Sequence, residues 1–127
     1  MVALRTLAEA LGEAARGGAG YAFVGDDLDT HRSYAEMHEA ARRVAGLLRS
    51  VGLGRGDLVG IVLPDAEQFL TALFGASLAG VVPASLCPPA SASDFPRYLA
   101  ATATVLRASG ARAVVTTPSL RAGFDEL

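Results

Sequence analysis

Apolar residues recur at helical spacing in two segments near the start of the chain, residues 3–16 and residues 34–51. Between them, residues 21–32 contain two short extended runs around a Gly-Asp-Asp turn, which predicts a β-hairpin. Ser33 and Glu36 have the S-x-x-E spacing of a capping box, in which each side chain bonds the backbone N–H of the other residue. We therefore expect the second helix to begin directly after Ser33.

Residues 57–89 have the pattern of a strand, a helix and a second strand. Residues 58–63 contain only Leu, Val, Ile and one Gly, and Pro64 ends this run. Residues 66–79 are helical in pattern, and residues 81–86 form a second, mostly apolar run. A short apolar run on each side of a capped helix predicts two parallel strands joined by a right-handed crossover.

The last third of the chain continues the same order of helix and strand. A small polar loop precedes Pro96, a residue that fits the first turn of a helix, and Gly110 is expected to end that helix. Residues 111–117 predict a third core strand, and Pro118 starts a final segment. Together these elements predict an α/β fold of the three-layer type, with a mostly parallel sheet, flanking helices and a short β-hairpin in front.

The helix predicted at residues 66–79 is apolar around most of its circumference, where Phe69, Leu70, Leu73 and Phe74 lie on different sides. Such a helix is usually covered on more than one side. Because the chain supplies few other helices, we expect part of this surface to contact structure outside the chain. That structure is either the rest of a larger protein, a partner, or a second copy in self-association.

Composition excludes several classes of partner. The chain has 127 residues, enough for one domain with a core, and a formal net charge of −2. We therefore expect neither a nucleic-acid footprint nor a polybasic membrane patch. Cys87 is the single cysteine and cannot form an internal disulfide, and no signal peptide or membrane-spanning run is evident. These features predict a cytoplasmic protein.

Three glycines and two histidines suggest a nucleotide-binding loop and a metal site, but their positions in the chain argue against both. Gly52, Gly54 and Gly56 are reminiscent of a dinucleotide-binding loop, but they follow a helix, precede a strand and have the wrong spacing, so we interpret them as a turn. His31 lies outside the second predicted helix, and His38 is expected to face solvent on it. We therefore interpret both as ordinary surface histidines rather than as a shared metal site.

Three further residues follow predicted strands, at the edge where open α/β sheets bind ligands. Cys87 has no adjacent basic residue to lower the pKa of its thiol, so we interpret it as a small packing residue. Asp65 and Glu67 are expected to cap the helix that they begin. The sequence contains no lysine, which excludes a catalytic, Schiff-base or phosphate-loop lysine. We therefore assign no catalytic, cofactor-binding or metal-binding residue to this chain.

Three motifs occur in the order found in adenylate-forming enzymes. Residues 32–37 (RSYAEM) resemble the family's TYxEL motif, and residues 54–64 (GRGDLVGIVLP) resemble its LxxGDxVxxxxP strand. Residues 74–83 (FGASLAGVVP) are similar to its AxxAGAVxVP segment. The resemblance implies the N-terminal subdomain of the adenylate-forming, or AMP-binding, fold.

Within that superfamily, three later segments resemble fatty acyl-AMP ligases. They are residues 85–89 (SLCPP), residues 97–99 (RYL) and residues 106–117 (LRASGARAVVTT). This resemblance implies a parent enzyme that uses ATP and Mg²⁺ to activate a fatty acid as an acyl-adenylate. It further implies transfer of the acyl group to an acyl carrier protein of a polyketide or nonribosomal peptide synthetase.

The resemblance covers only the N-terminal part of the family's large domain. The family's phosphate loop, nucleotide-contacting motifs and catalytic lysine have no counterpart here, and residues 116–119 are too short and lack glycine. We expect residues 1–127 to form a single partial domain that binds no ATP, is inactive alone and packs against the remainder of its own adenylating domain. A stand-alone interaction or scaffold module, an amino-acid adenylation domain and an acyl-CoA synthetase remain as alternatives.

Overall fold

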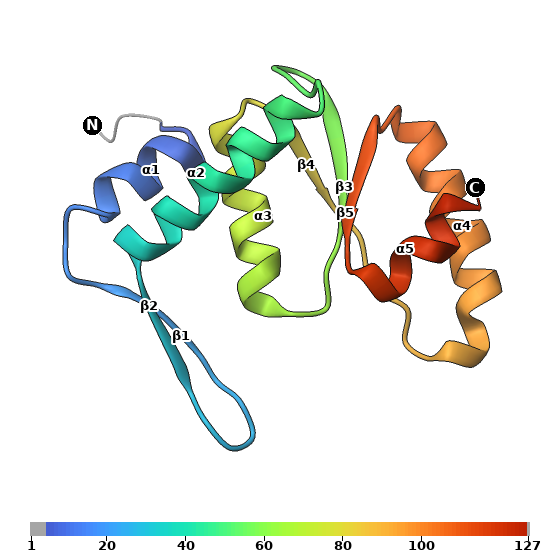
Figure 1. Ribbon diagram of the computed structural model, residues 1–127, viewed down its shortest axis with the longest axis horizontal. Coiled ribbons are helices and arrows are strands. Elements are labelled where there is room, and N and C mark those ends of the chain that lie inside the picture. The colour runs from blue at the N-terminus through green and yellow to red at the C-terminus, as the bar shows by residue number, and fades with distance from the viewer. Residues whose placement is uncertain (1–4, 127) are drawn as a thin grey trace.

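A computed structural model describes residues 5–126 of the chain. Within these described residues there are five α-helices, one short 3₁₀ helix and five strands (Figure 1). In chain order they are α1 (Leu7–Ala14), β1 (Gly20–Phe23), β2 (Thr30–Ser33), α2 (Tyr34–Ser50), β3 (Leu58–Val62), α3 (Ala66–Leu78), β4 (Val82–Ser85), η1 (Ala92–Asp94), α4 (Phe95–Ser109), β5 (Ala113–Thr116) and α5 (Pro118–Asp125).

A three-stranded parallel sheet in the order β4-β3-β5 forms the centre of the fold. The central strand β3 is its most buried part, since Val59, Ile61 and Val62 are inaccessible to solvent. Strands β3 and β4 are joined through α3, and β4 and β5 through α4, so the parallel pairing predicted from the sequence is confirmed. Strands β1 and β2 form the predicted antiparallel hairpin, which projects from the body of the molecule (Figure 1).

Helices cover both faces of the parallel sheet, which confirms the three-layer arrangement. Figure 1 shows α1, α2 and α3 on one side of the sheet and α4 and α5 on the other. Side chains agree with this view, because Ala113 and Val115 of β5 pack against the core shared with α2 and α3. On the opposite face, a Cβ added to Gly60 would lie 2.8 Å from Leu106 of α4 and 3.7 Å from Val114. Among residues 5–126, no helix is long and apolar enough to cross a membrane.

Helix α3 is covered from two sides by this chain itself. It contacts α1 and α2 on one side and β3 and β4 on the other. Helix α1 and the hairpin add a second small core that includes Phe74. Phe69, Leu70 and Leu73 are only partly buried, so the expectation that part of this apolar surface contacts structure outside the chain stays a prediction. The large apolar side chains that are exposed in the described part of the chain belong to other elements: Leu7, Val24, Leu28, Leu47, Val51, Val82 and Val105.

Local signals in the sequence set the helix boundaries. The Ser33 hydroxyl accepts a hydrogen bond from the Glu36 N–H at 3.1 Å, and the Glu36 carboxylate accepts one from the Ser33 N–H at 3.0 Å. This capping box is the one expected, and the Ser33 bonds lower the pKa of Glu36. A second capping box, between Thr6 and Glu9, begins α1 at Leu7, later than the residues 3–16 expected. Residues 3 and 4 of that expected helix lie outside the described residues.

Candidate functional site

Two places in the fold merit examination as functional sites: the carboxyl edge of the parallel sheet, and a groove along β5. The carboxyl edge is where open α/β sheets bind their ligands, and the acidic residues Asp65 and Glu67 both lie there. Asp65 accepts a hydrogen bond from the Gln68 N–H at 2.9 Å and thereby caps α3. Glu67 accepts a hydrogen bond from Arg32 Nε at 2.7 Å and so links α3 to the hairpin. The capping role expected for Asp65 is confirmed, and Glu67 also forms an ion pair that the sequence did not indicate.

Cys87 follows β4 at the same edge, as the sequence predicted, and its side chain is exposed and free. The Tyr98 hydroxyl donates a hydrogen bond to the Cys87 carbonyl oxygen at 2.6 Å, which fastens this loop to α4. Burial raises the pKa of Tyr98, so the phenol remains a neutral donor across the physiological range. The interpretation of Cys87 as a packing residue is therefore wrong, because its side chain is exposed and only its backbone carbonyl contacts Tyr98.

A hollow of about 320 Å³ lies between the loop after β4 and the start of α5. Its polar residues are Ser91 and Ser119. The Ser91 hydroxyl lies 3.1 Å from that of Ser93 and donates to Asp94, while Ser119 contacts the Thr117 hydroxyl that caps α5. Acyl transfer needs a nucleophile paired with a general base, and the lining of this hollow supplies no histidine, lysine or cysteine for that role.

The two histidines occupy separate surfaces. His31 is exposed on β2, whereas His38 is half-buried on α2. The Nε2 atom of His38 lies 3.8 Å from the position that a Cβ on Gly12 would take, so this ring faces α1. The expectation that His38 faces solvent is therefore wrong, because α1 packs on that side of α2. No group of three or more His, Cys, Asp or Glu residues that could hold a metal ion occurs within residues 5–126.

The glycines before β3 form a turn at the amino end of the strand, far from a position that could bind pyrophosphate. Gly52 and Gly56 have φ of 91° and 86°, a left-handed conformation that favours glycine. The Gly54 N–H donates to Asp57 Oδ2 at 2.9 Å, and Arg112 donates to the same oxygen at 3.2 Å. The Gly54 hydrogen bond, with Arg112 beside it, holds the pKa of Asp57 below its usual value. The turn therefore has a structural role: it connects α2 to β3, and Asp57 links it to Arg112 next to β5.

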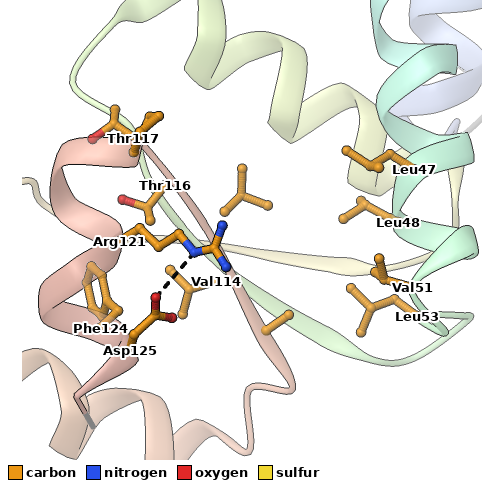
Figure 2. Close-up of a pocket in the computed structure, with 13 residues that line it drawn as sticks. Leu47, Leu48, Val51, Leu53, Val114, Thr116, Thr117, Arg121, Phe124 and Asp125 are labelled. Carbon is orange, nitrogen blue, oxygen red and sulfur yellow. Dashed lines mark hydrogen bonds and ion pairs between the residues drawn. The ribbon is translucent and has the colours of Figure 1, made fainter.

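A groove of about 680 Å³ lies along β5 (Figure 2). We call it the β5 groove and define it by its lining. One wall comes from the end of α2, the floor from β5, and the other wall from α5. The lining residues are Leu47, Leu48, Val51, Leu53, Ala113, Val114, Val115, Thr116, Thr117, Pro118, Arg121, Phe124 and Asp125.

Apolar side chains dominate the β5 groove. Leu47 is 63% exposed and Val51 is 66% exposed, values far above those of core residues. Arg121 and Asp125 are the charged residues of the lining, and Arg121 Nε lies 3.3 Å from Asp125 Oδ2 (Figure 2). Because these two charges pair with each other, the groove offers a mainly apolar surface.

The chain is similar to adenylate-forming enzymes along nearly its whole length. The family described as AMP-binding enzyme matches residues 12–126. The long-chain-fatty-acid–CoA ligase FadD13 of Mycobacterium tuberculosis is 26% identical over 104 residues, which are 82% of this chain and 21% of the relative. The salicyl-AMP ligase / salicyl-S-ArCP synthetase of the same organism is 37% identical over 71 residues, 56% of this chain and 13% of the relative.

A solved structure agrees with these matches. A structure from a study of fatty acyl-adenylate ligases from E. coli and L. pneumophila superposes with a TM-score of 0.88 and 25% sequence identity, covering 97% of this chain and 22% of that one. The chain thus spans about a fifth of the length of this structure and of FadD13. The expected fold, that of the N-terminal subdomain of adenylate-forming enzymes, is confirmed. On the match over residues 12–126, the chain belongs to the AMP-binding enzyme family.

Proposed function

We propose that this chain is the N-terminal part of a fatty acid–AMP ligase. One observation carries the proposal: the family matches residues 12–126, yet the sequence contains no lysine that could serve as the family's catalytic lysine. The fatty acyl-adenylate ligase structure supports the choice of a fatty acid as substrate, because it superposes on 97% of this chain. Residues 1–127 are then one partial domain, which supplies structure to an active site completed elsewhere.

In the proposed reaction, a carboxylate oxygen of the fatty acid attacks the α-phosphorus of ATP. A new P–O bond forms, the bond to the β-phosphate oxygen breaks, and pyrophosphate leaves. The acyl-adenylate is then attacked at its carbonyl carbon by the phosphopantetheine thiol of a carrier protein, and AMP leaves as the thioester forms. We place the binding of ATP and Mg²⁺ in the remainder of the enzyme, because the acidic residues near the carboxyl edge, Asp65 and Glu67, already serve as a cap and an ion pair.

Members of this family differ in the acceptor that their names give for the acyl group. FadD13 is named a CoA ligase, whereas the salicyl relative is named a salicyl-S-ArCP synthetase. An acyl-CoA synthetase and an amino-acid adenylation domain are therefore competing members of the same family. The SLCPP segment at residues 85–89 and the superposition with fatty acyl-adenylate ligases favour the carrier-protein route. We extend the proposal to the cytoplasm, since Cys87 is a free thiol.

Calorimetry tests whether ATP and Mg²⁺ bind outside this chain. Titration of the isolated chain with ATP and Mg²⁺ should show no saturable binding at micromolar concentrations, because a phosphate loop and a lysine are lacking. Sequencing the encoding DNA beyond the Leu127 codon should reveal an open frame that leads into a Gly/Ser/Thr-rich loop with a lysine. The longer protein should then release pyrophosphate only when fatty acid is present. Saturable ATP binding by the isolated chain would contradict the proposal.

A stand-alone interaction module is a second candidate, and the β5 groove is the observation that favours it. Leu47 and Val51 expose apolar surface that a partner or a second copy would cover. Sedimentation over a wide concentration range separates the candidates. Self-association of the chain supports the module, whereas a monomer at every concentration counts against it.

A further inference from the structure

We propose that a groove along α2, lined by two arginines, is a docking site for an acidic amphipathic helix of another protein. We call this surface the arginine groove and define it by its lining, which is His38, Arg42, Ala45 and Arg49 of α2 and Leu78 of α3. Its volume is about 290 Å³. The inference does not depend on the proposed reaction, and it concerns a surface separate from the carboxyl edge and the β5 groove.

The α2 residues of the arginine groove form one stripe. Steps of four, three and four positions separate them, and residues three or four apart lie on the same face of a helix. With a rise of about 1.5 Å per residue, Arg42 and Arg49 start about 10 Å apart along the axis of α2. Ala45 lies between them, and Leu78 lines the same hollow from α3, which packs beside α2 (Figure 1). The groove therefore presents two positive charges with an apolar floor between them.

The guanidinium groups of the arginine groove are not neutralised by short ion pairs. Arg49 Nη2 donates a hydrogen bond to the Leu78 carbonyl oxygen at 3.0 Å, and a carbonyl oxygen carries no net charge. Arg42 Nη1 lies 3.7 Å from Glu39 Oε2, beyond the range of about 2.7–2.9 Å for a charge-assisted hydrogen bond. Water weakens this pair further, because the two side chains are 65% and 59% exposed. None of the described residues that line the groove is Asp or Glu, so an acidic partner meets only positive charge in its lining.

The length of the groove matches a short stretch of helix. His38 lies at one end, where its half-buried ring faces Gly12 of α1. Arg49 lies at the other end, one residue before α2 ends at Ser50. The distance from position 38 to position 49 is about 16 Å along the helix axis, or about three turns. A partner helix of three turns therefore spans the groove from end to end.

The spacing of charge and apolar surface favours a helix over a small anion. The hydrogen bond to Leu78 holds Arg49 against α3, so one phosphate would not bridge it to Arg42 about two turns away. A phosphate also has no apolar group to cover Ala45 and Leu78. On an amphipathic helix, acidic residues at i and i+7 are likewise about 10 Å apart, and an apolar residue at i+3 or i+4 lies between them on the same face. Such a helix complements both the charges and the floor, and a helix lying in a groove is a common mode of recognition.

Binding of a synthetic peptide to the chain of residues 1–127 tests this inference. The probe is a fluorescent, alanine-based helical peptide of about 20 residues with Glu at i and i+7 and Leu at i+3. The control peptide has the same composition, with its Glu residues spread over all faces. Fluorescence anisotropy at low salt should show that the patterned peptide binds at least about fivefold more tightly than the control. Amide chemical shifts in NMR spectra should change along residues 38–49 and at Leu78.

Two substitutions separate docking in the groove from attraction by net charge. Arg42→Gln should weaken binding of the patterned peptide by about fivefold. Arg43→Gln is the matched control, because Arg43 is the next residue of α2, is also exposed and lies outside the groove lining. It removes the same charge and should change the affinity by less than about twofold.

The possible outcomes decide the inference whether or not the chain binds ATP. A preference for the patterned peptide that Arg42→Gln alone reduces supports the acidic helix. Equal binding of the two peptides, or equal losses in the two variants, overturns it, because net charge then accounts for the binding. Binding of inorganic phosphate or of phosphatidylglycerol vesicles that Arg42→Gln alone reduces, without a preference between the peptides, also overturns it in favour of a small anion or a lipid surface. Chemical-shift changes confined to the β5 groove overturn it as well.

Discussion

Gly75 lies where α3 packs directly against α2, so replacing it with alanine should separate the two helices. A Cβ on Gly75 would lie 2.5 Å from Val44 Cγ1, 2.6 Å from Val44 Cβ and 3.0 Å from the Ala41 carbonyl oxygen. Carbon atoms in optimal contact are about 3.5–4.0 Å apart. Rotation of the Val44 side chain moves Cγ1 but not Cβ, and the Ala41 oxygen belongs to the helix backbone. The clash is therefore relieved only by moving α2 and α3 apart.

Two opposing effects set the expected magnitude. Overpacking a core contact costs about 1–3 kcal/mol, and the fixed atoms at Gly75 place this site at the upper end of that range. Alanine is favoured over glycine in a helix interior by about 1 kcal/mol. We therefore expect Gly75→Ala to destabilise the protein by about 2 kcal/mol, which lowers the melting temperature by about 5–10 °C in a domain of this size.

Gly46 is a matched control for the same substitution. It is an exposed glycine inside α2, and a Cβ there would meet no atom within 4 Å. Gly46→Ala should therefore stabilise the protein by about 0.5–1 kcal/mol. Thermal and urea unfolding of both variants measure the difference between them.

A double-mutant cycle with Val44→Gly tests the steric cause. That second substitution removes both Val44 atoms, so the cost of Gly75→Ala should fall by about 1 kcal/mol or more in its background. The reasoning fails if Gly75→Ala is as stable as the parent protein while Gly46→Ala is stabilising, or if the two sites show no coupling.

Three further predictions concern polar contacts. Because the pKa of Asp57 is lowered in the fold, its carboxylate stabilises the protein above the unfolded-state pKa and loses this effect as pH falls through about 4 towards the folded-state pKa. Asp57→Asn should therefore flatten the dependence of the melting temperature on pH in that range. Parallel melting-temperature profiles for the variant and the parent protein would contradict this prediction. Tyr98→Phe removes the 2.6 Å hydrogen bond to the Cys87 carbonyl and should lower the free energy of unfolding by about 0.5–1.5 kcal/mol, measured by urea unfolding. An unchanged urea midpoint would show that this hydrogen bond contributes nothing to stability. Glu67→Gln breaks the half-exposed ion pair with Arg32 and should lower the free energy of unfolding by less than about 1 kcal/mol at low salt. The loss should be smaller still in 1 M NaCl, because salt screens the pair. A loss that does not depend on salt would argue against an electrostatic contribution.

Features that depend on local sequence were predictable, because the partners lie within one helical turn. The capping box of Ser33 and Glu36 is such a case. The end of α4 at Gly110, which has a left-handed conformation with φ of 73°, is another. The Thr6 and Glu9 box has the same spacing as the first and was available to the same reasoning. It would have placed the start of α1 at Leu7.

Features that depend on distant partners were not predictable from one sequence. Asp57 and Arg112 are 55 positions apart, and only the pairing of β3 with β5 brings them together. His38 turns towards α1 because α1 packs on α2, a contact that helical periodicity does not specify. The same limitation applies to α3. Its all-round apolar pattern correctly required cover on several sides, but the pattern could not say that α1 and α2 supply much of that cover.

The polar groups at the carboxyl edge and the apolar β5 groove differ in whether they have partners within the described residues. At the carboxyl edge of the sheet, Asp65 caps α3, Glu67 pairs with Arg32 and Thr117 caps α5. Each of these groups already has a structural partner, which accounts for its position. The β5 groove differs, because its apolar walls and its free strand edge have no partner in the described part of the chain. Apolar surface without a partner in the described residues is thus concentrated at the β5 groove, which makes the groove the first place to look for a contact with another polypeptide.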